Sequence, residues 1–105
     1  FDQLFAEWGL DVVEAIHYFG ERDKIHHVHY RNPKGTYPYY EEPFIDEGDT
    51  DMFRAMQAYR DVNYRFTLCS DHVPQMADDT GPGYIGRTYN HGYIRAMIQA
   101  VNSVT

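Results

Sequence analysis

Two short runs of this 105-residue sequence carry side chains that bind metal ions or move protons. The first run, residues 26–32, contains three histidines followed by an arginine. The second run, residues 69–74, places Asp71 and His72 directly before Val73 and Pro74. Each run stands where an extended segment gives way to a loop, and reactive groups of open α/β sheets and barrels lie at that end of a strand. The two runs therefore predict a site at the carboxyl ends of two strands.

His29 is the strongest ligand candidate in the first run. It falls at the loop end of its strand, on the same face as Arg31, and neutral imidazole is a common ligand for divalent transition metals. A strand histidine is more often a surface or core residue without a chemical role. We favour that reading for His26, which the alternation directs toward the helices, and for His27, which lies one layer deeper than His29.

Asp71 offers a hard oxygen ligand, and the adjacent His72 offers a titratable group. The competing interpretation is a turn closed by an Asx hydrogen bond. A metal site needs three or four protein ligands, so one histidine and one aspartate are too few. Either the remaining ligands lie outside this sequence or the chain binds no metal.

Cys69 is the only cysteine of the chain, which excludes an internal disulfide. We expect a buried, inert thiol, because no positive charge close in sequence is placed to stabilise a thiolate. Arg31 and Arg87 could hold a carboxylate, with a solvated arginine as the alternative for each. His17 and His91 fall on predicted helices and are expected at the surface.

The hydrophobic pattern predicts helix, strand, helix, strand, helix. The expected elements are a helix from Asp11 to about Phe19, a strand over 25–30, a helix beginning at 49–51, a strand over 65–70 and a helix over about 85–101. A long loop is expected from residue 32 to Gly48, and such loops are more often functional than idle. The last helix is expected to bury Tyr89, Tyr93, Met97 and Ile98 or Val101.

Ile25 in the first predicted strand and Thr67 in the second stand 42 residues apart, which is the spacing of repeated βα units. Two parallel strands covered by helices leave an unpaired edge on each side, and more strands would repair both edges. The sequence also lacks an initiator methionine. We therefore expect an α/β fold that forms one incomplete domain, a piece of a larger sheet or barrel.

Composition restricts the partners. Nine Lys plus Arg residues against sixteen Asp plus Glu residues give a net charge of −7, which argues against nucleic acid and anionic membranes as partners. No run approaches the roughly 18 apolar residues of a membrane span, and the first residues show no signal-peptide pattern. These features suit a cytoplasmic protein.

Three longer runs together show a family resemblance. The sequence KIHHVHYRNPKGTYPYYEEPFIDEGDTDM, followed by SDHVPQMADD and PGYIGRTYNHGYIRAMIQAV, resembles the C-terminal part of the mannonate dehydratases. Those enzymes belong to the xylose-isomerase-like (β/α)8 barrels. The resemblance covers nearly the whole chain and implies a C-terminal barrel fragment spanning residues 1–105.

The resemblance also implies an activity and a site. The family dehydrates D-mannonate to 2-dehydro-3-deoxy-D-gluconate in hexuronate catabolism, with a divalent metal that is usually Mn(II), Fe(II) being possible. Carried over by motif, His29 and Asp71 are implied metal ligands, and His72 and Tyr84 are the implied acid and base. Arg31 is a candidate for binding the substrate carboxylate. The remaining ligands, a cysteine and a histidine, would lie upstream, so Cys69 is not the family's ligand.

Two other functions stay open at this point. One is a metal-dependent sugar isomerase or epimerase on the same barrel, because similar ligand sets serve both reactions. The other is a non-catalytic module, since the 105 residues hold about half a metal site and are expected to lack turnover by themselves. The full-length protein is expected to form a homo-oligomer.

Overall fold

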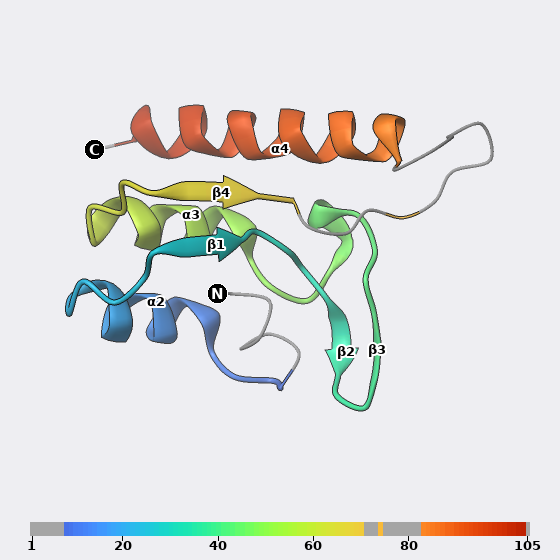
Figure 1. The fold of residues 1–105 in the computed structure, drawn as a ribbon, viewed down its shortest axis with the longest axis horizontal. Helices are drawn as coiled ribbons and strands as arrows, with labels where there is room; N and C mark the ends of the chain where they lie inside the picture. Colours follow the sequence, from blue (N-terminus) through green and yellow to red (C-terminus); the bar gives the residue numbers. More distant parts are fainter. Residues whose placement is uncertain (1–7, 71–73, 75–82, 105) are drawn as a thin grey trace.

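The computed structural model describes residues 8–70, 74 and 83–104. Within them the chain forms a small α/β arrangement with an additional hairpin (Figure 1). The elements are α2 (Val12–Gly20), β1 (His27–His29), β2 (Lys34–Thr36), β3 (Tyr39–Glu41), η1 (Ile45–Glu47), α3 (Met52–Asp61), β4 (Thr67–Cys69) and α4 (Tyr84–Asn102).

Strands β1 and β4 pair in parallel, as the sequence predicts. His27 lies opposite Thr67, Val28 opposite Leu68, and His29 opposite Cys69. The pairing continues past β1, where the Tyr30 amide donates to the Cys69 carbonyl over 2.8 Å. Both strands point toward the side of the molecule where the hairpin and the start of α4 lie (Figure 1). The carboxyl ends of the two strands are therefore adjacent.

The helices cover one face of this two-stranded sheet. Helix α3 contacts both α2 and α4, and the strands lie over it (Figure 1). Val28 and Tyr30 point into the core between sheet and helices and are fully buried, and the Tyr30 hydroxyl donates to the Met52 carbonyl. Because side chains alternate along a strand, His27 and His29 lie on the opposite face.

Helices α2 and α3 begin where their capping residues predict. The Asp11 carboxylate accepts from the Glu14 amide, and the Asp51 carboxylate accepts from the Arg54 amide, each over 3.1 Å. Each bond satisfies one of the backbone donors left open at a helix start. Helix α3 packs an apolar stripe against the core. Its buried residues are Met52, Ala55, Met56, Ala58 and Tyr59, with Phe53 partly buried against them.

The prediction of a loop from residue 32 to Gly48 is wrong in part, because that segment contains an antiparallel hairpin. Strands β2 and β3 pair in register from Lys34 with Glu41 to Thr36 with Tyr39, and the 3-10 turn η1 follows. The many prolines and glycines of the segment favour a loop by propensity alone. The short hairpin forms around them.

The predicted buried face of α4 is partly wrong. The helix buries Gly86, Asn90, Ile94 and Val101, whereas Tyr89 and Ile98 are exposed. Tyr93 and Met97 pack at the margin of the core. The buried face of α4 is thus rotated about the helix axis relative to the predicted face, because the prediction assigned the large aromatic residues to the core. The Tyr89 hydroxyl instead donates to the Asp46 carboxylate over 2.8 Å at the surface.

Two strand predictions also need correction. Both strands are shorter than predicted, at three residues each. His26 does not face the helices but is exposed, with its Nε2 3.2 Å from the Asp23 carbonyl, and Ile25 is buried in its place. The strand pleat begins only at His27, so the alternation does not extend back to residues 25 and 26.

The buried Asn32 side chain joins the end of β1 to the start of α3. Its Nδ2 donates to the Ile45 carbonyl over 2.7 Å and to the Thr50 carbonyl over 3.0 Å. Its Oδ1 accepts from the Thr50 amide over 2.7 Å. Gly48 passes so close that a Cβ there would lie 1.9 Å from the Asn32 carbonyl oxygen. One amide therefore satisfies three backbone groups and fixes the route into α3.

Arg60 joins the other ends of the helices. From α3 its Nη1 donates to the Val101 carbonyl and, over 2.7 Å, to the Val104 carbonyl. The last carbonyls of α4 have no partner within the helix, so a cation there supplies hydrogen bonds and favourable charge. In the part of the chain that the structure describes, no helix combines the length and the apolar character needed to cross a bilayer.

We predict that Gly48→Ala destabilises the full-length protein by more than about 2 kcal/mol, because overpacking would add to the loss of buried hydrogen bonds of Asn32. Gly92→Ala is the matched control, since a Cβ at that position meets nothing within 4 Å. It should be neutral or stabilise α4 by up to about 1 kcal/mol. Urea unfolding of both variants measures the difference. Equal stability of the two would contradict the close contact.

Candidate metal-binding site

The structure describes three of the five residues predicted to form the site. His29, Arg31 and Tyr84 lie in the described part of the chain, whereas Asp71 and His72 lie outside it. The described three are placed at or beyond the carboxyl end of β1 or at the start of α4. Figure 1 shows that α4 begins on the side toward which β1 and β4 point.

His29 ends β1 with a half-buried imidazole on the sheet face away from the helices. It is one of three side chains whose ligand atoms all lie within 4.8 Å of one another, the others being His27 and Cys69. The rings of His27 and His29 meet edge to face, with their centroids 5.1 Å apart. The strand pairing creates this group, because His29 stands opposite Cys69 and His27 is two residues back on the same face.

Thr67 fixes how His27 presents its ring. The Nδ1 of His27 lies 2.9 Å from the Thr67 hydroxyl, its partner across the strand pair. The Nε2 of the same ring lies 3.8 Å from the Cys69 sulfur. One ring nitrogen is therefore held by a hydroxyl while the other faces a thiol.

The expectation of a buried thiol at Cys69 is wrong, since the residue is only half-buried. Its sulfur borders the sheet face that the described elements leave uncovered. The sequence predicts only a structural role for His27 and does not predict its contact with Cys69. Aligning the two strands in parallel would have shown the pairing, because histidines at 27 and 29 then stand opposite Thr67 and Cys69.

Arg31 is buried, at 1% exposure, rather than projecting freely beside His29. Its Nη2 donates to the Pro43 carbonyl over 3.4 Å, so part of the guanidinium is held by the segment after the hairpin. Contact with a substrate carboxylate stays a prediction for this residue. Tyr84 opens α4 with a side chain that is 66% exposed, so its hydroxyl is accessible.

His91 is exposed, as expected for a helix surface residue. Its Nε2 nevertheless lies 3.3 Å from the hydroxyl of Ser70, which directly follows β4 and is buried. The contact ties α4 to the carboxyl end of β4. No chemical role is needed to account for it.

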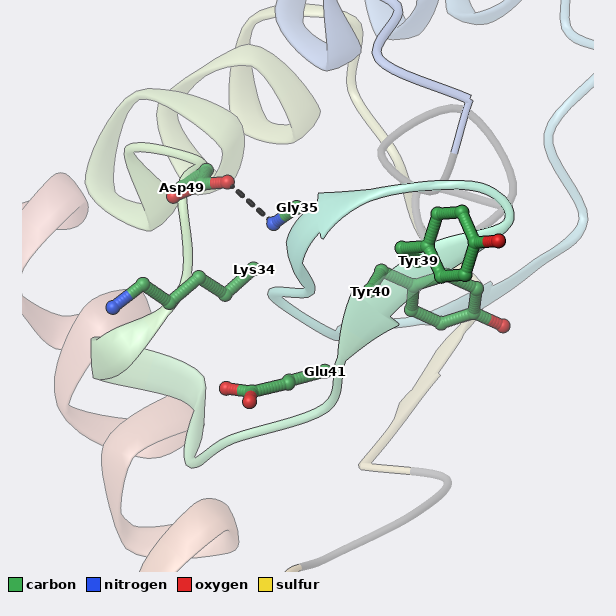
Figure 2. A pocket seen from close by; sticks show the side chains of 6 residues that line it. All are labelled: Lys34, Gly35, Tyr39, Tyr40, Glu41 and Asp49. Carbon is green, nitrogen blue, oxygen red and sulfur yellow. Dashed lines mark hydrogen bonds between the residues drawn. The ribbon is translucent and has the colours of Figure 1, made fainter.

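A pocket among the described residues lies on the hairpin, and none of the histidines of β1 lines it. It has a volume of about 740 Å³ and is lined by Lys34, Gly35, Tyr39, Tyr40, Glu41 and Asp49. Figure 2 shows Asp49 closing one side, where its carboxylate accepts from the Gly35 amide over 2.7 Å. Of the predicted site residues that the structure describes, none lines it, and it is an open surface hollow between a hairpin and the approach to α3.

Comparison with known proteins places the chain in a family. The sequence profile of D-mannonate dehydratase (UxuA) matches residues 4–105. The chain belongs to the D-mannonate dehydratase family. It is 33% identical over 104 residues to mannonate dehydratase 2 of Halalkalibacterium halodurans, a match that covers 90% of this chain and 30% of that protein. The mannonate dehydratase of Oceanobacillus iheyensis is 32% identical over 99 residues, covering 89% and 28%.

A solved structure agrees with the fold. The mannonate dehydratase from Streptococcus suis serotype 2 superposes with a TM-score of 0.77 at 24% identity, covering 89% of this chain and 28% of that one. The chain thus adopts the α/β arrangement of part of that protein. It spans less than a third of the length of the relatives it matches.

Tyr89 and Asp46 form a pH-sensitive pair on the α4 surface. The hydrogen bond to Asp46 raises the pKa of the Tyr89 hydroxyl above its usual value of 10.0, and desolvation and the negative charge of Glu47 add to the rise. Because the folded state holds this proton more tightly than the unfolded state does, the pair stabilises the folded state. This contribution is fully present below the pKa of Tyr89 in the unfolded state. That contribution is lost as the pH rises through the higher folded pKa.

We predict that a tyrosinate absorbance titration of wild type minus Tyr89→Phe has a midpoint above pH 10. Asp46→Asn should lower this midpoint, because the amide removes the negative charge that opposes ionisation. Tyr18→Phe is the control for loss of an exposed tyrosine on another helix. A Tyr89 midpoint that does not respond to Asp46→Asn would contradict the assigned cause.

Proposed function

We propose that the protein carrying this chain dehydrates D-mannonate to 2-dehydro-3-deoxy-D-gluconate with the help of a divalent cation. The observation that carries the proposal is the family match over residues 4–105. The cation would be Mn(II), with Fe(II) as the second choice. The protein would act in the cytoplasm as a homo-oligomer and take a small sugar acid as its substrate.

The chain would supply the C-terminal part of a (β/α)8 barrel. Parallel pairing of β1 and β4, with helices on one face, supports this proposal. The described sheet has two strands, so each strand has an edge that a neighbouring barrel strand would pair. In a barrel the face bearing His27 and His29 would line the interior, and the carboxyl ends of the strands would form the active-site end.

The donor chemistry of His29 fits the proposed cation. Its imidazole is half-buried at the carboxyl end of β1, and imidazole and carboxylate suit first-row divalent ions. His29 and Asp71 would hold the ion together with a cysteine and a histidine from earlier strands. When bound, a divalent cation stabilises negative charge on substrate oxygen atoms as the proton beside the carboxylate is removed.

The remaining chemistry is proton transfer by His72 and Tyr84. One of them would remove the proton next to the substrate carboxylate. The other would protonate the neighbouring hydroxyl, whose carbon–oxygen bond breaks to release water and leave an enol that becomes the keto product. The exposed hydroxyl of Tyr84 at the start of α4 is accessible for this role. Arg31 would bind the substrate carboxylate.

The purified full-length protein, assayed with D-mannonate and Mn(II), tests the proposal. We expect keto-acid formation that a chelator abolishes and added Mn(II) restores. Isomerisation of ketoses without dehydration of D-mannonate would assign the protein to the isomerase or epimerase class instead.

We predict that Asp71→Asn removes most of the bound Mn(II) while the fold persists, because it replaces a charged ligand at a strand end. Metal analysis after dialysis and circular dichroism measure the two effects. Asp61→Asn, on the far end of α3, is the control and should keep its metal. Full metal content in Asp71→Asn would disprove the ligand assignment.

His72→Asn should instead keep its metal and lose turnover by roughly 10²–10⁴-fold, the usual contribution of one acid or base. Tyr84→Phe should also keep its metal and lose turnover. In plots of turnover against pH, one variant should lose the acidic limb and the other the basic limb. Tyr39→Phe, an exposed tyrosine of the hairpin, is the control for Tyr84→Phe. Near wild-type turnover in either site variant would exclude that residue from acid–base chemistry.

A further inference from the structure

We propose that His27, His29 and Cys69 form a binding site for a thiophilic divalent cation such as Zn(II), distinct from the ligand set that includes Asp71 although the two sets share His29. These are the three residues whose ligand atoms lie within 4.8 Å of one another. All three lie on the same face of the β1–β4 pair, so one ion can reach them together. The face is not covered by any of the described helices (Figure 1).

The distances suit tetrahedral zinc. Zinc–nitrogen bonds of about 2.0–2.1 Å and a zinc–sulfur bond of about 2.3 Å place the two donor atoms about 3.6 Å apart at the tetrahedral angle. The Nε2 of His27 and the sulfur of Cys69 are 3.8 Å apart. The third donor, from His29, lies within 4.8 Å of the other two.

Thr67 supplies the support that metal-bound histidines usually have. A ligating histidine directs its other ring nitrogen to a hydrogen-bond acceptor, which fixes the tautomer and the orientation of the ring. The hydroxyl of Thr67 lies 2.9 Å from Nδ1 of His27 and can accept that hydrogen bond. The lone pair of Nε2 is then free to face Cys69 and a metal.

The donor types select the cation. A thiolate favours zinc and other soft or borderline ions, whereas carboxylate-rich sets suit manganese and magnesium. Three protein ligands leave a fourth position for water, as in zinc sites that are not closed. With two imidazoles, one thiolate and no carboxylate, the cluster would therefore bind zinc in preference to Mn(II).

His29 is common to both sets, so the experiment must separate them. Zinc binding at the cluster needs no reaction with D-mannonate and does not rest on the proposed activity. The background for the test is full-length Asp71→Asn protein, in which the proposed manganese set is disabled. Cobalt(II) is the probe, because coordination by a thiolate gives a charge-transfer absorption that nitrogen and oxygen ligands do not.

We expect metal-free Asp71→Asn protein to bind one cobalt ion per chain with this absorption and zinc to displace it. Adding Cys69→Ser should remove the part of this absorption that the cluster contributes, although the cysteine of the proposed manganese set is still present. His27→Gln should weaken cobalt binding at least tenfold. Thr67→Val, which removes the hydroxyl but keeps the shape, should weaken it by about 10–100-fold. His26→Asn, an exposed neighbour outside the cluster, is the control and should leave binding unchanged.

Circular dichroism of each apo-protein establishes that the variants fold. Cys69→Ser protein with unchanged cobalt absorption and stoichiometry would overturn the site, as would folded His27→Gln protein with unchanged affinity. The two variants alter different strands, so misfolding of one leaves the other to decide. Loss of turnover in Asp71→Asn with retained cobalt binding would support both sets, whereas retained turnover would overturn only the Asp71 assignment.

Discussion

The parallel pairing of β1 with β4 is the constraint on which the rest of the structure depends. Its register sets Val28 and Tyr30 against the helices and, on the other face, brings His27 and His29 beside Thr67 and Cys69. A shift of one residue in either strand would exchange the two faces of that strand. The core and the cluster of His27, His29 and Cys69 are therefore consequences of the same hydrogen-bonded register.

Two side chains hold the helices in place around this pair. Asn32 satisfies three backbone groups near the start of α3, and Arg60 reaches from the end of α3 to the last carbonyls of α4. Buried backbone groups without partners are expensive, so the Asn32 contacts act by preventing a loss as much as by adding attraction. The Arg60 bond to Val104 is exposed and acts mainly by attraction at the helix end. The carboxyl end of β1 thus has a fixed position relative to α3, which is what a site at that end requires.

The order of the main elements could be predicted from the sequence, because Asp11 and Asp51 cap helices with clear apolar stripes. Local rules failed where the outcome depends on partners distant in sequence. The exposed position of Tyr89 is such a case, since Tyr89 is held by Asp46, 43 residues away. The hairpin after Asn32 is instead a local pairing that the sequence does not predict, because its prolines and glycines favour a loop by propensity. For the site, motif resemblance predicts His29 as a ligand, and grouping it with His27 and Cys69 requires the register between strands 40 residues apart. The positions predicted at Asp71 and His72 lie outside the described residues.

The hairpin segment is closed at its base, where the Asp49 amide donates to the Pro33 carbonyl over 3.0 Å and the Asp49 carboxylate accepts from Gly35. The chain between these residues leaves the rest of the fold and returns to it at two points that these hydrogen bonds hold together. Lengthening or shortening its tip leaves the distance between β1 and α3 unchanged, and the entropic cost of a longer closed loop grows only slowly with length. Evolution can therefore reshape the tip, where Tyr39 is exposed, without moving His29. The tip is the natural place for differences among relatives, and for an inserted tag or label that leaves the strand ends undisturbed.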